Sequence, residues 1–163
     1  MNALLLIPDN VSEVLVKIIR FTDLRRRILH QNLHNVDTPC FTPRDLPVRE
    51  FAEVLNEAVA EHLRSHRLLF RDTGNIQFGP KDTMRIQPEV DSHAHGLLQT
   101  DRDEYVELQV NKLLENSLNR KIAEELLRHK CGMYPCVPPW EANEIAADGN
   151  PSVDLPTYRD VPE

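Results

Sequence analysis

Apolar residues near the N-terminus recur at helical spacing. Between residues 11 and 34 they are separated by three or four positions, which places them on one face of an α-helix. They are Val11, Val14, Ile18, Phe21, Leu24 and Ile28. The opposite face carries Arg26, Arg27 and Gln31. The pattern predicts a long helix over about residues 11–34.

A second long helix is predicted over about residues 101–131, where no Gly or Pro interrupts the sequence. Its apolar residues recur at every fourth position: Val106, Val110, Leu114, Leu118, Ile122 and Leu126. A helix turns once in about 3.6 residues, so this stripe drifts by about 40° at each step. A winding stripe needs two or more neighbouring helices, and we expect some of them to come from other subunits. We expect the hydroxyl of Thr100 to cap the start of this helix.

The stretch between these helices is predicted to be less regular. Helical spacing of apolar residues predicts a short third helix over about residues 48–65. The middle segment, residues 66–99, is weakly patterned. Residues 76–78 and 84–86 alternate as short strands do, which allows either a small β-hairpin or a mobile loop.

The last thirty residues differ in composition from the rest. Residues 134–163 hold six acids, one base and six of the twelve prolines. Such a composition is typical of a disordered acidic tail. The predicted organisation is therefore a mainly α helical domain, residues 1–133, followed by a disordered tail, residues 134–163.

Charge and hydropathy exclude several classes of protein. The 163-residue chain has a net charge of −7, which argues against binding to nucleic acid. Its longest apolar run, residues 3–7, is far shorter than the roughly 20 residues of a membrane-spanning helix. No Lys or Arg precedes residue 17, so a cleaved secretory signal is not expected. We expect neither nucleic-acid binding nor membrane insertion.

Histidines are the strongest lead to an enzyme. His30 and His34 are one helical turn apart, as two ligands of a transition metal can be. A catalytic zinc site also needs a third ligand and a general base, and the Glu that follows the first His of H-E-x-x-H is missing here. Histidines without metal are the favoured interpretation. We therefore expect no enzyme, no cofactor and no metal, with His30 and His34 as the weak metal candidates.

The most informative stretch follows the first helix. It contains an ordered set of polar, proline and aromatic residues: Asn32, Asn35, Asp37, Thr38, Pro39, Phe41, Arg44 and Asp45. Asn35 can end the helix in the left-handed conformation, and Pro39 moves Thr38 out of the helical region. Phe41 supplies an aromatic anchor. These residues predict a helix end that redirects the chain.

This order of residues resembles the motif that ends the first helix of flagellar basal-body rod proteins, N-I/L-A-N-x-D/N-T-P-G-Y. Arg44 and Asp45 make the proximal rod proteins the most similar members. Residues 113–118 resemble the L-x-E-N-x-L core of that family's C-terminal helix, with Asn116 at the Asn position. Together these stretches cover about half of the chain, residues 11–51 and 100–131. The chain departs from the motif at Cys40, where the family has Gly, and at His34 and Pro43.

The resemblance implies a structural subunit of the periplasmic rod in the bacterial flagellum basal body. Such subunits leave the cytoplasm through the flagellar type III export apparatus without a cleaved signal. Their terminal helices pair as a coiled coil and assemble helically into a rod that transmits torque and forms the export channel. Partners would be copies of the chain, other rod proteins, the basal-body ring and the export apparatus. The implied assembly helix carries Val106, Val110, Leu114, Asn116, Leu118, Ile122 and Leu126.

Two other hypotheses stay open from the sequence. One is a cytosolic helical adaptor or chaperone-like module whose winding helix holds a partner. The other is a metalloenzyme that uses His30 and His34.

Overall fold

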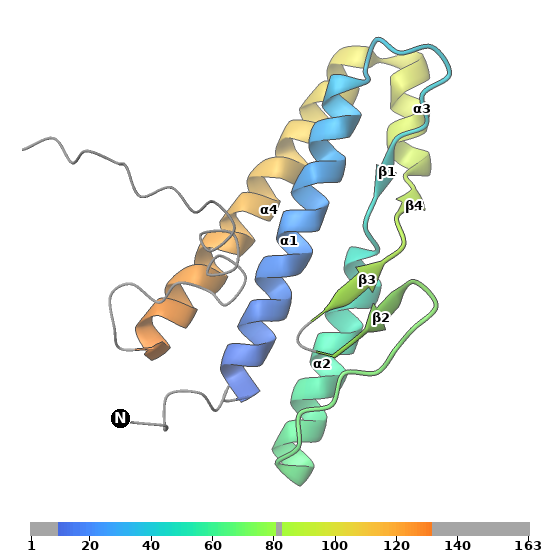
Figure 1. Cartoon of the computed structure of the whole chain (residues 1–163). Coiled ribbons are helices and arrows are strands. Elements are labelled where there is room, and N and C mark those ends of the chain that lie inside the picture. Colours follow the sequence, from blue (N-terminus) through green and yellow to red (C-terminus); the bar gives the residue numbers. More distant parts are fainter. Residues whose placement is uncertain (1–9, 81–82, 132–163) are drawn as a thin grey trace, which may run out of the picture. The chain divides into compact units, whose positions relative to one another are not determined.

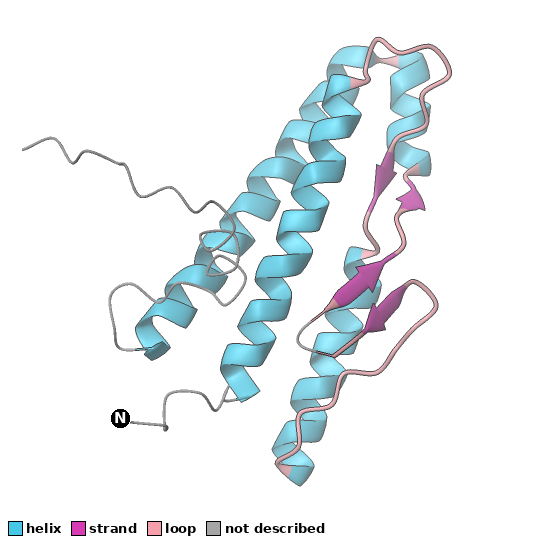
Figure 2. Ribbon diagram, viewed as in Figure 1, coloured by secondary structure: helices cyan, strands magenta, loops and turns pink. Residues whose placement is uncertain are grey.

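The computed structural model describes residues 10–80 and 83–131 (Figure 1). Its elements, in chain order, are α1 (Asn10–His34), β1 (Arg44–Asp45), α2 (Val48–Ser65), β2 (Ile76–Phe78), β3 (Met84–Ile86), β4 (Glu89–Val90), α3 (Ser92–Thr100) and α4 (Arg102–Cys131). The fold is mainly helical, with two small antiparallel sheets (Figure 2). That confirms the predicted fold class at this level. The predicted tail, residues 134–163, lies outside the described residues.

Helices α1 and α4 run antiparallel, side by side (Figure 1). They occupy the two stretches that periodicity predicted as long helices. Aliphatic residues of α1 such as Ile19 and Leu29 are fully buried, as is Tyr105 of α4. None of the described helices is both long enough and apolar enough to cross a membrane.

Helix α2 packs against α1 through a small aromatic and aliphatic core. Its central residues are Phe21, Leu46, Phe51 and Ile76, all buried. The rings of Phe21 and Phe51 are stacked with their centroids 4.0 Å apart. Burying each of these side chains stabilises the fold by about 1.5–3 kcal/mol. This core holds α2 and the β2–β3 hairpin on one side of α1.

The hairpin predicted from alternation is present, so of the two alternatives for that stretch the β-hairpin is confirmed. β2 pairs with β3 in antiparallel register, with Ile76 opposite Ile86 and Phe78 opposite Met84. The second sheet, in which β1 pairs with β4, was not predicted. Two residues on each side form it, with Arg44 opposite Val90.

The prediction of a weakly structured middle segment is wrong for residues 92–99. Helix α3 lies there, and the Asp91 carboxylate caps it by accepting a hydrogen bond from the Ala94 amide at 3.0 Å. The cap stabilises a short helix whose sequence has little apolar periodicity. Gly96 lies inside the helix, which further weakens the sequence signal.

The predicted cap of the second long helix is also wrong. The Thr100 hydroxyl donates to the Gly96 carbonyl at 3.0 Å, at the end of α3. Asp101 caps α4 instead, accepting a hydrogen bond from the Glu104 amide at 3.0 Å. A carboxylate at this position also interacts favourably with the positive end of the helix dipole.

Candidate functional site

Asn35 ends α1 by hydrogen bonding and not by a left-handed backbone. Its side-chain amide donates to the Gln31 carbonyl at 2.8 Å, and its carbonyl oxygen accepts from the Thr38 hydroxyl at 3.2 Å. The Thr38 amide also donates to the Asn35 backbone carbonyl at 3.0 Å. The expectation of a left-handed Asn35 is therefore wrong. The turn is closed by the side chain, as Asn commonly does.

The left-handed residue of this turn is Cys40, with φ at 58°. It is one of two non-glycine residues with positive φ among the described residues, the other being His66 at the end of α2. Positive φ brings Cβ close to the backbone and costs a non-glycine residue about 1–2 kcal/mol. The position where the rod-protein motif has Gly thus adopts the conformation for which Gly is suited. The Cys40 thiol is free, and the residue is exposed.

Asn32 connects the end of α1 to β1, where the chain runs back along the helix. Its side-chain amide donates to the Arg44 carbonyl at 2.7 Å, and its oxygen accepts from the Arg44 amide at 3.2 Å. The same amide donates to Oε1 of Gln109 on α4 at 3.0 Å. Only 2% of Asn32 is exposed. One buried side chain therefore joins α1, β1 and α4.

Asp45 is the centre of a partly buried charge cluster. Its carboxylate accepts two hydrogen bonds from the Arg25 guanidinium, at 2.9 and 3.0 Å. Lys112 of α4 donates to the same carboxylate at 2.9 Å and also pairs with Asp91. Because Asp91 caps α3, the cluster ties α1, β1, α3 and α4 together. Two cations and two carboxylates balance one another, as buried charges require.

The cluster shifts the pKa values of its members. Burial raises the pKa of Asp45, but hydrogen bonds and charge from Arg25 and Lys112 outweigh it, so the pKa lies below its ordinary value of 3.8. Burial lowers the pKa of Lys112, but Asp91 and Asp45 outweigh it, and the pKa lies above 10.5. Burial and the charge of Asp91 raise the pKa of Tyr105 to about 12. Near neutral pH, both members of the Asp45–Lys112 pair are charged and Tyr105 is neutral.

The face of α4 toward α1 is partly polar, and periodicity did not predict this. Tyr105 donates its hydroxyl hydrogen to the Asn32 carbonyl at 3.0 Å. Asn116 donates to the Thr22 carbonyl at 2.7 Å. Gln109 lies between them and is fully buried. Asn116, which the sequence placed in the assembly helix, therefore serves the contact between α1 and α4 within one chain.

The predicted apolar stripe points away from α1. Five of its six residues are exposed, by 41–64%: Val110, Leu114, Leu118, Ile122 and Leu126. We call these five residues the α4 ridge. The sixth, Val106, is half-buried. The ridge spans seventeen residues, 110–126, about 24 Å of helix.

The rest of the motif lines a shallow groove beside α3. Asp37 forms an ion pair with Arg102 at the start of α4. Pro39 and Phe41 line a groove of about 350 Å³ together with His95 and Leu98 of α3. The motif residues are thus brought together, with Asn32 and Asp45 in the interior and Asp37 and Pro39 at the surface.

His30 and His34 both lie on the exposed face of α1. Among residues 10–80 and 83–131, no group of three or more His, Cys, Asp or Glu is placed to hold a metal ion. A metal at His30 and His34 would therefore lack a third ligand within the described residues. The residues that sequence reasoning missed are Arg25, Tyr105, Gln109 and Lys112, because their partners are distant in the chain.

Comparisons of the chain with protein-family models, with curated proteins and with solved structures give no match. The resemblance to rod proteins therefore depends on the sequence motif.

Proposed function

We propose that the chain is a structural subunit of the bacterial flagellar basal-body rod, most similar to the proximal rod proteins. Its paired terminal helices, as a coiled coil, assemble helically with copies of the chain and with other rod proteins. The rod that results transmits torque and encloses the export channel. The proposal includes the periplasmic location, contact with the basal-body ring and export apparatus, and export without a cleaved signal.

The α4 ridge is the observation that carries this proposal. Five large aliphatic side chains in one row remain exposed after α4 has packed on α1. Contiguous apolar surface of this kind marks an interaction site in a protein with an otherwise polar exterior. A subunit that needs neighbours on its outer face accounts for the ridge without invoking a substrate or cofactor.

The turn after α1 also supports the proposal, because it is formed by the residues that resemble the rod-protein motif. Cys40 has positive φ at the motif's Gly position, and Asn32 and Asp45 form the bonds that hold the chain reversal. The residues that carry the resemblance are therefore structural residues of one turn. Their arrangement favours a role in shaping the subunit.

The cytosolic adaptor is the second candidate, and the shape of the ridge is what favours it. Adjacent residues of a row at every fourth position fit a partner helix crossing at about −50°, although the whole winding ridge needs more than one such helix. Helices from a client protein could meet that requirement. The two candidates differ in location, because an adaptor predicts a soluble complex outside the flagellum.

Mass spectrometry of purified hook–basal bodies from the source organism tests the proposal. A rod subunit is expected in a fixed ratio to the other rod proteins. The cytosolic fraction of the same cells, probed for the chain, is the matched comparison. Absence from basal bodies together with abundance in the cytosol would overturn the rod proposal and favour the adaptor.

A further inference from the structure

A second surface of the chain also exposes aliphatic side chains. It comprises residues 62–71, the last turn of α2 and the segment after it, which we call the α2 tip. Leu63 and Leu69 are 75% and 56% exposed there. Neither takes part in the polar contacts that hold α1 to α4. The chain therefore presents two separate apolar surfaces, the α2 tip and the α4 ridge.

The charges beside the two surfaces are opposite. The α2 tip carries Arg64, Arg67 and Arg71, all exposed, and residues 62–71 contain no Asp or Glu. Exposed acids accompany the α4 ridge at three positions: Glu107, Glu115 and Glu125. Lys121 is an exposed base in the same stretch.

The other two bases of that stretch face into the subunit. Lys112 pairs with Asp45 and Asp91, and Arg120 pairs with Asp23 of α1. Their charge is balanced inside the chain. Glu125 pairs with Arg128, and Glu115 lies 3.9 Å from the Arg25 guanidinium, so the outer side of α4 keeps a small excess of acid. Opposite charge around two apolar surfaces favours their association and sets its orientation.

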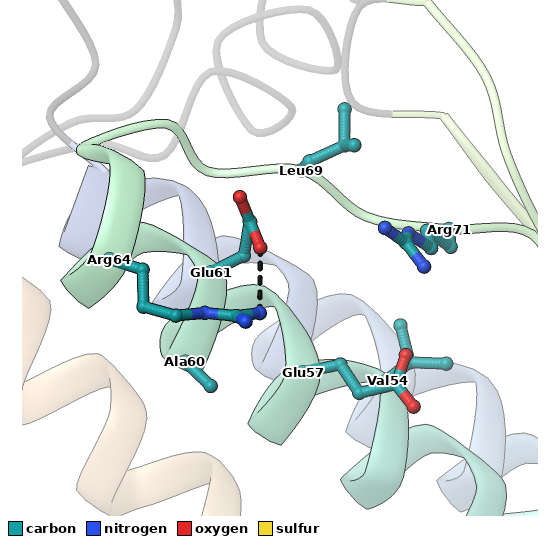
Figure 3. A pocket seen from close by; sticks show the side chains of 7 residues that line it. All are labelled: Val54, Glu57, Ala60, Glu61, Arg64, Leu69 and Arg71. Atoms are coloured by element: carbon teal, nitrogen blue, oxygen red, sulfur yellow. Dashed lines mark hydrogen bonds and ion pairs between the residues drawn. The ribbon is translucent and has the colours of Figure 1, made fainter.

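A groove at the α2 tip gives a place for an aliphatic side chain (Figure 3). It measures about 280 Å³ and lies between α2 and the segment that carries Leu69 and Arg71. Val54 and Ala60 contribute apolar lining from α2. Arg64, at the edge, pairs with Glu61 at 2.8 Å. Glu57 and Glu61 also line the groove, so its charged lining is mixed and its aliphatic part comes from Val54, Ala60 and Leu69.

We infer that the α2 tip of one copy of this chain binds the α4 ridge of a second copy. Leu63 and Leu69 pack on the ridge, and Arg64, Arg67 and Arg71 face its acids. The contact joins two different surfaces, so each copy keeps one of each free for further copies. Such head-to-tail association builds an open helical assembly or a ring. The inference names one contact of the assembly proposed above and depends on the self-association in that proposal.

Two alternative occupants, residues 134–163 and a second ridge, suit the ridge less well. Residues 134–163 carry six acids and one base, so the acids beside the ridge would repel them. A ridge-to-ridge dimer would bring Glu107, Glu115 and Glu125 of two copies together, and like charges oppose it. The α2 tip, which carries three arginines, would not be repelled by the acids beside the ridge.

Mixing two variants of the full-length chain tests the inference. Leu63→Asp blocks the tip of one chain, and Leu118→Asp blocks the ridge of the other. Each variant alone is expected to sediment as a monomer, with association at least tenfold weaker than in the wild-type chain. A mixture of the two retains one intact tip and one intact ridge and is expected to form a one-to-one dimer. Val90→Asp, an equal change at a residue that is 55% exposed on β4, serves as the control and should associate like the wild type.

The charge contribution has its own test. Arg67→Glu should weaken association, and Glu115→Arg in the second chain of a mixture should restore part of it. Higher salt should weaken the wild-type association because exposed charges are screened. Circular dichroism of each variant checks that the helices are retained.

Several results would overturn the inference. They are a wild-type chain that stays monomeric, a Leu63→Asp chain that associates normally, or two monomeric variants whose mixture forms no dimer. Normal association of Leu63→Asp with loss in Leu118→Asp would indicate ridge-to-ridge pairing. None of these results would overturn the rod proposal, because a chain that is found in basal bodies can assemble through other contacts. The mass spectrometry of basal bodies tests that proposal separately.

Discussion

The side-chain amide of Asn116 donates a hydrogen bond to the backbone carbonyl of Thr22 at 2.7 Å, across 94 residues of sequence. Both residues are buried. Asn at this position therefore has a structural role within the subunit, whereas Leu114 and Leu118 of the same helix lie exposed. Two faces of α4 thus have separate tasks. One is partly polar and packs on α1, and the other is aliphatic and exposed.

Asn32→Ala is expected to destabilise the fold by about 2–3 kcal/mol, because it leaves buried hydrogen-bonding partners unsatisfied. The partners that lose their bonds are the Arg44 backbone and the Gln109 side chain. Urea unfolding followed by circular dichroism measures the loss. Asn35→Ala, which removes exposed hydrogen bonds, is the matched control and should cost less than about 1 kcal/mol. Equal losses in the two variants would contradict the joining role of Asn32.

The Asp45 cluster predicts a loss of stability in acid. Because the pKa of Asp45 is lowered by folding, its contribution is complete above 3.8 and is lost as the pH falls through the lower folded pKa. The free energy of unfolding should therefore fall more steeply below pH 3.8 in the wild type than in Asp45→Asn. Urea unfolding at a series of pH values measures the slopes. Glu57→Gln, at an exposed acid of α2, should keep the wild-type slope, and an unchanged slope in Asp45→Asn would refute the prediction.

Cys40→Gly is expected to stabilise the chain by about 0.5–1 kcal/mol, since relief at positive φ exceeds the added entropy of the unfolded state. Thermal unfolding should show a higher midpoint. Cys40→Ser retains a Cβ and should leave the midpoint near that of the wild type. A rise in Cys40→Ser equal to that in Cys40→Gly would assign the effect to the thiol and not to the backbone.

Leu118→Asp or Ile122→Asp is expected to abolish motility while the protein still accumulates in the cell. The side chains are exposed in the subunit, so their loss removes a contact with a neighbour and leaves the fold intact. A swimming assay together with an immunoblot measures both effects. Val90→Asp is the control and should swim normally. A motile Leu118→Asp strain would count strongly against a packed role for the ridge.

Deletion of residues 134–163 is expected to leave rod assembly intact, because this stretch has no periodic apolar face. Filament counts by electron microscopy measure the effect in a strain that carries the truncated chain. Leu118→Asp, which changes the ridge and keeps the bonds of Lys112 and Asn116, is the comparison and should abolish filaments. Filament loss on removal of the tail alone would reveal a function of the tail that its composition does not indicate.

Periodicity predicted the elements that have a regular apolar face. α1, α2 and α4 were anticipated within a residue, and the β2–β3 hairpin was one of the two alternatives for its stretch. α3 was missed because its stability depends on the Asp91 cap and on contact with α4, and its own sequence has a weak pattern. β1 and β4 were missed because two-residue strands depend on tertiary contacts alone.

The candidate site was predictable only in part. The motif located the turn and its polar residues, and the spacing of four located the ridge. Neither could show that Asp45 meets Lys112, since 67 residues separate them in the sequence. Nor could spacing alone show which face of α4 meets α1, because polar Gln109 and Asn116 replace aliphatic residues on that face.

The polar bonds between α1 and α4 have a mechanical consequence. A helix pair held only by aliphatic contacts can slip by one turn and recover similar packing. Here Gln109 and Asn116 each bond one particular partner on α1, and Lys112 holds two carboxylates at a third point of α4. Slippage along the helix axis would break all of these bonds at once and leave their buried donors and acceptors without partners. The helix pair therefore has a locked register, as the proposed rod subunit would need under a twisting load.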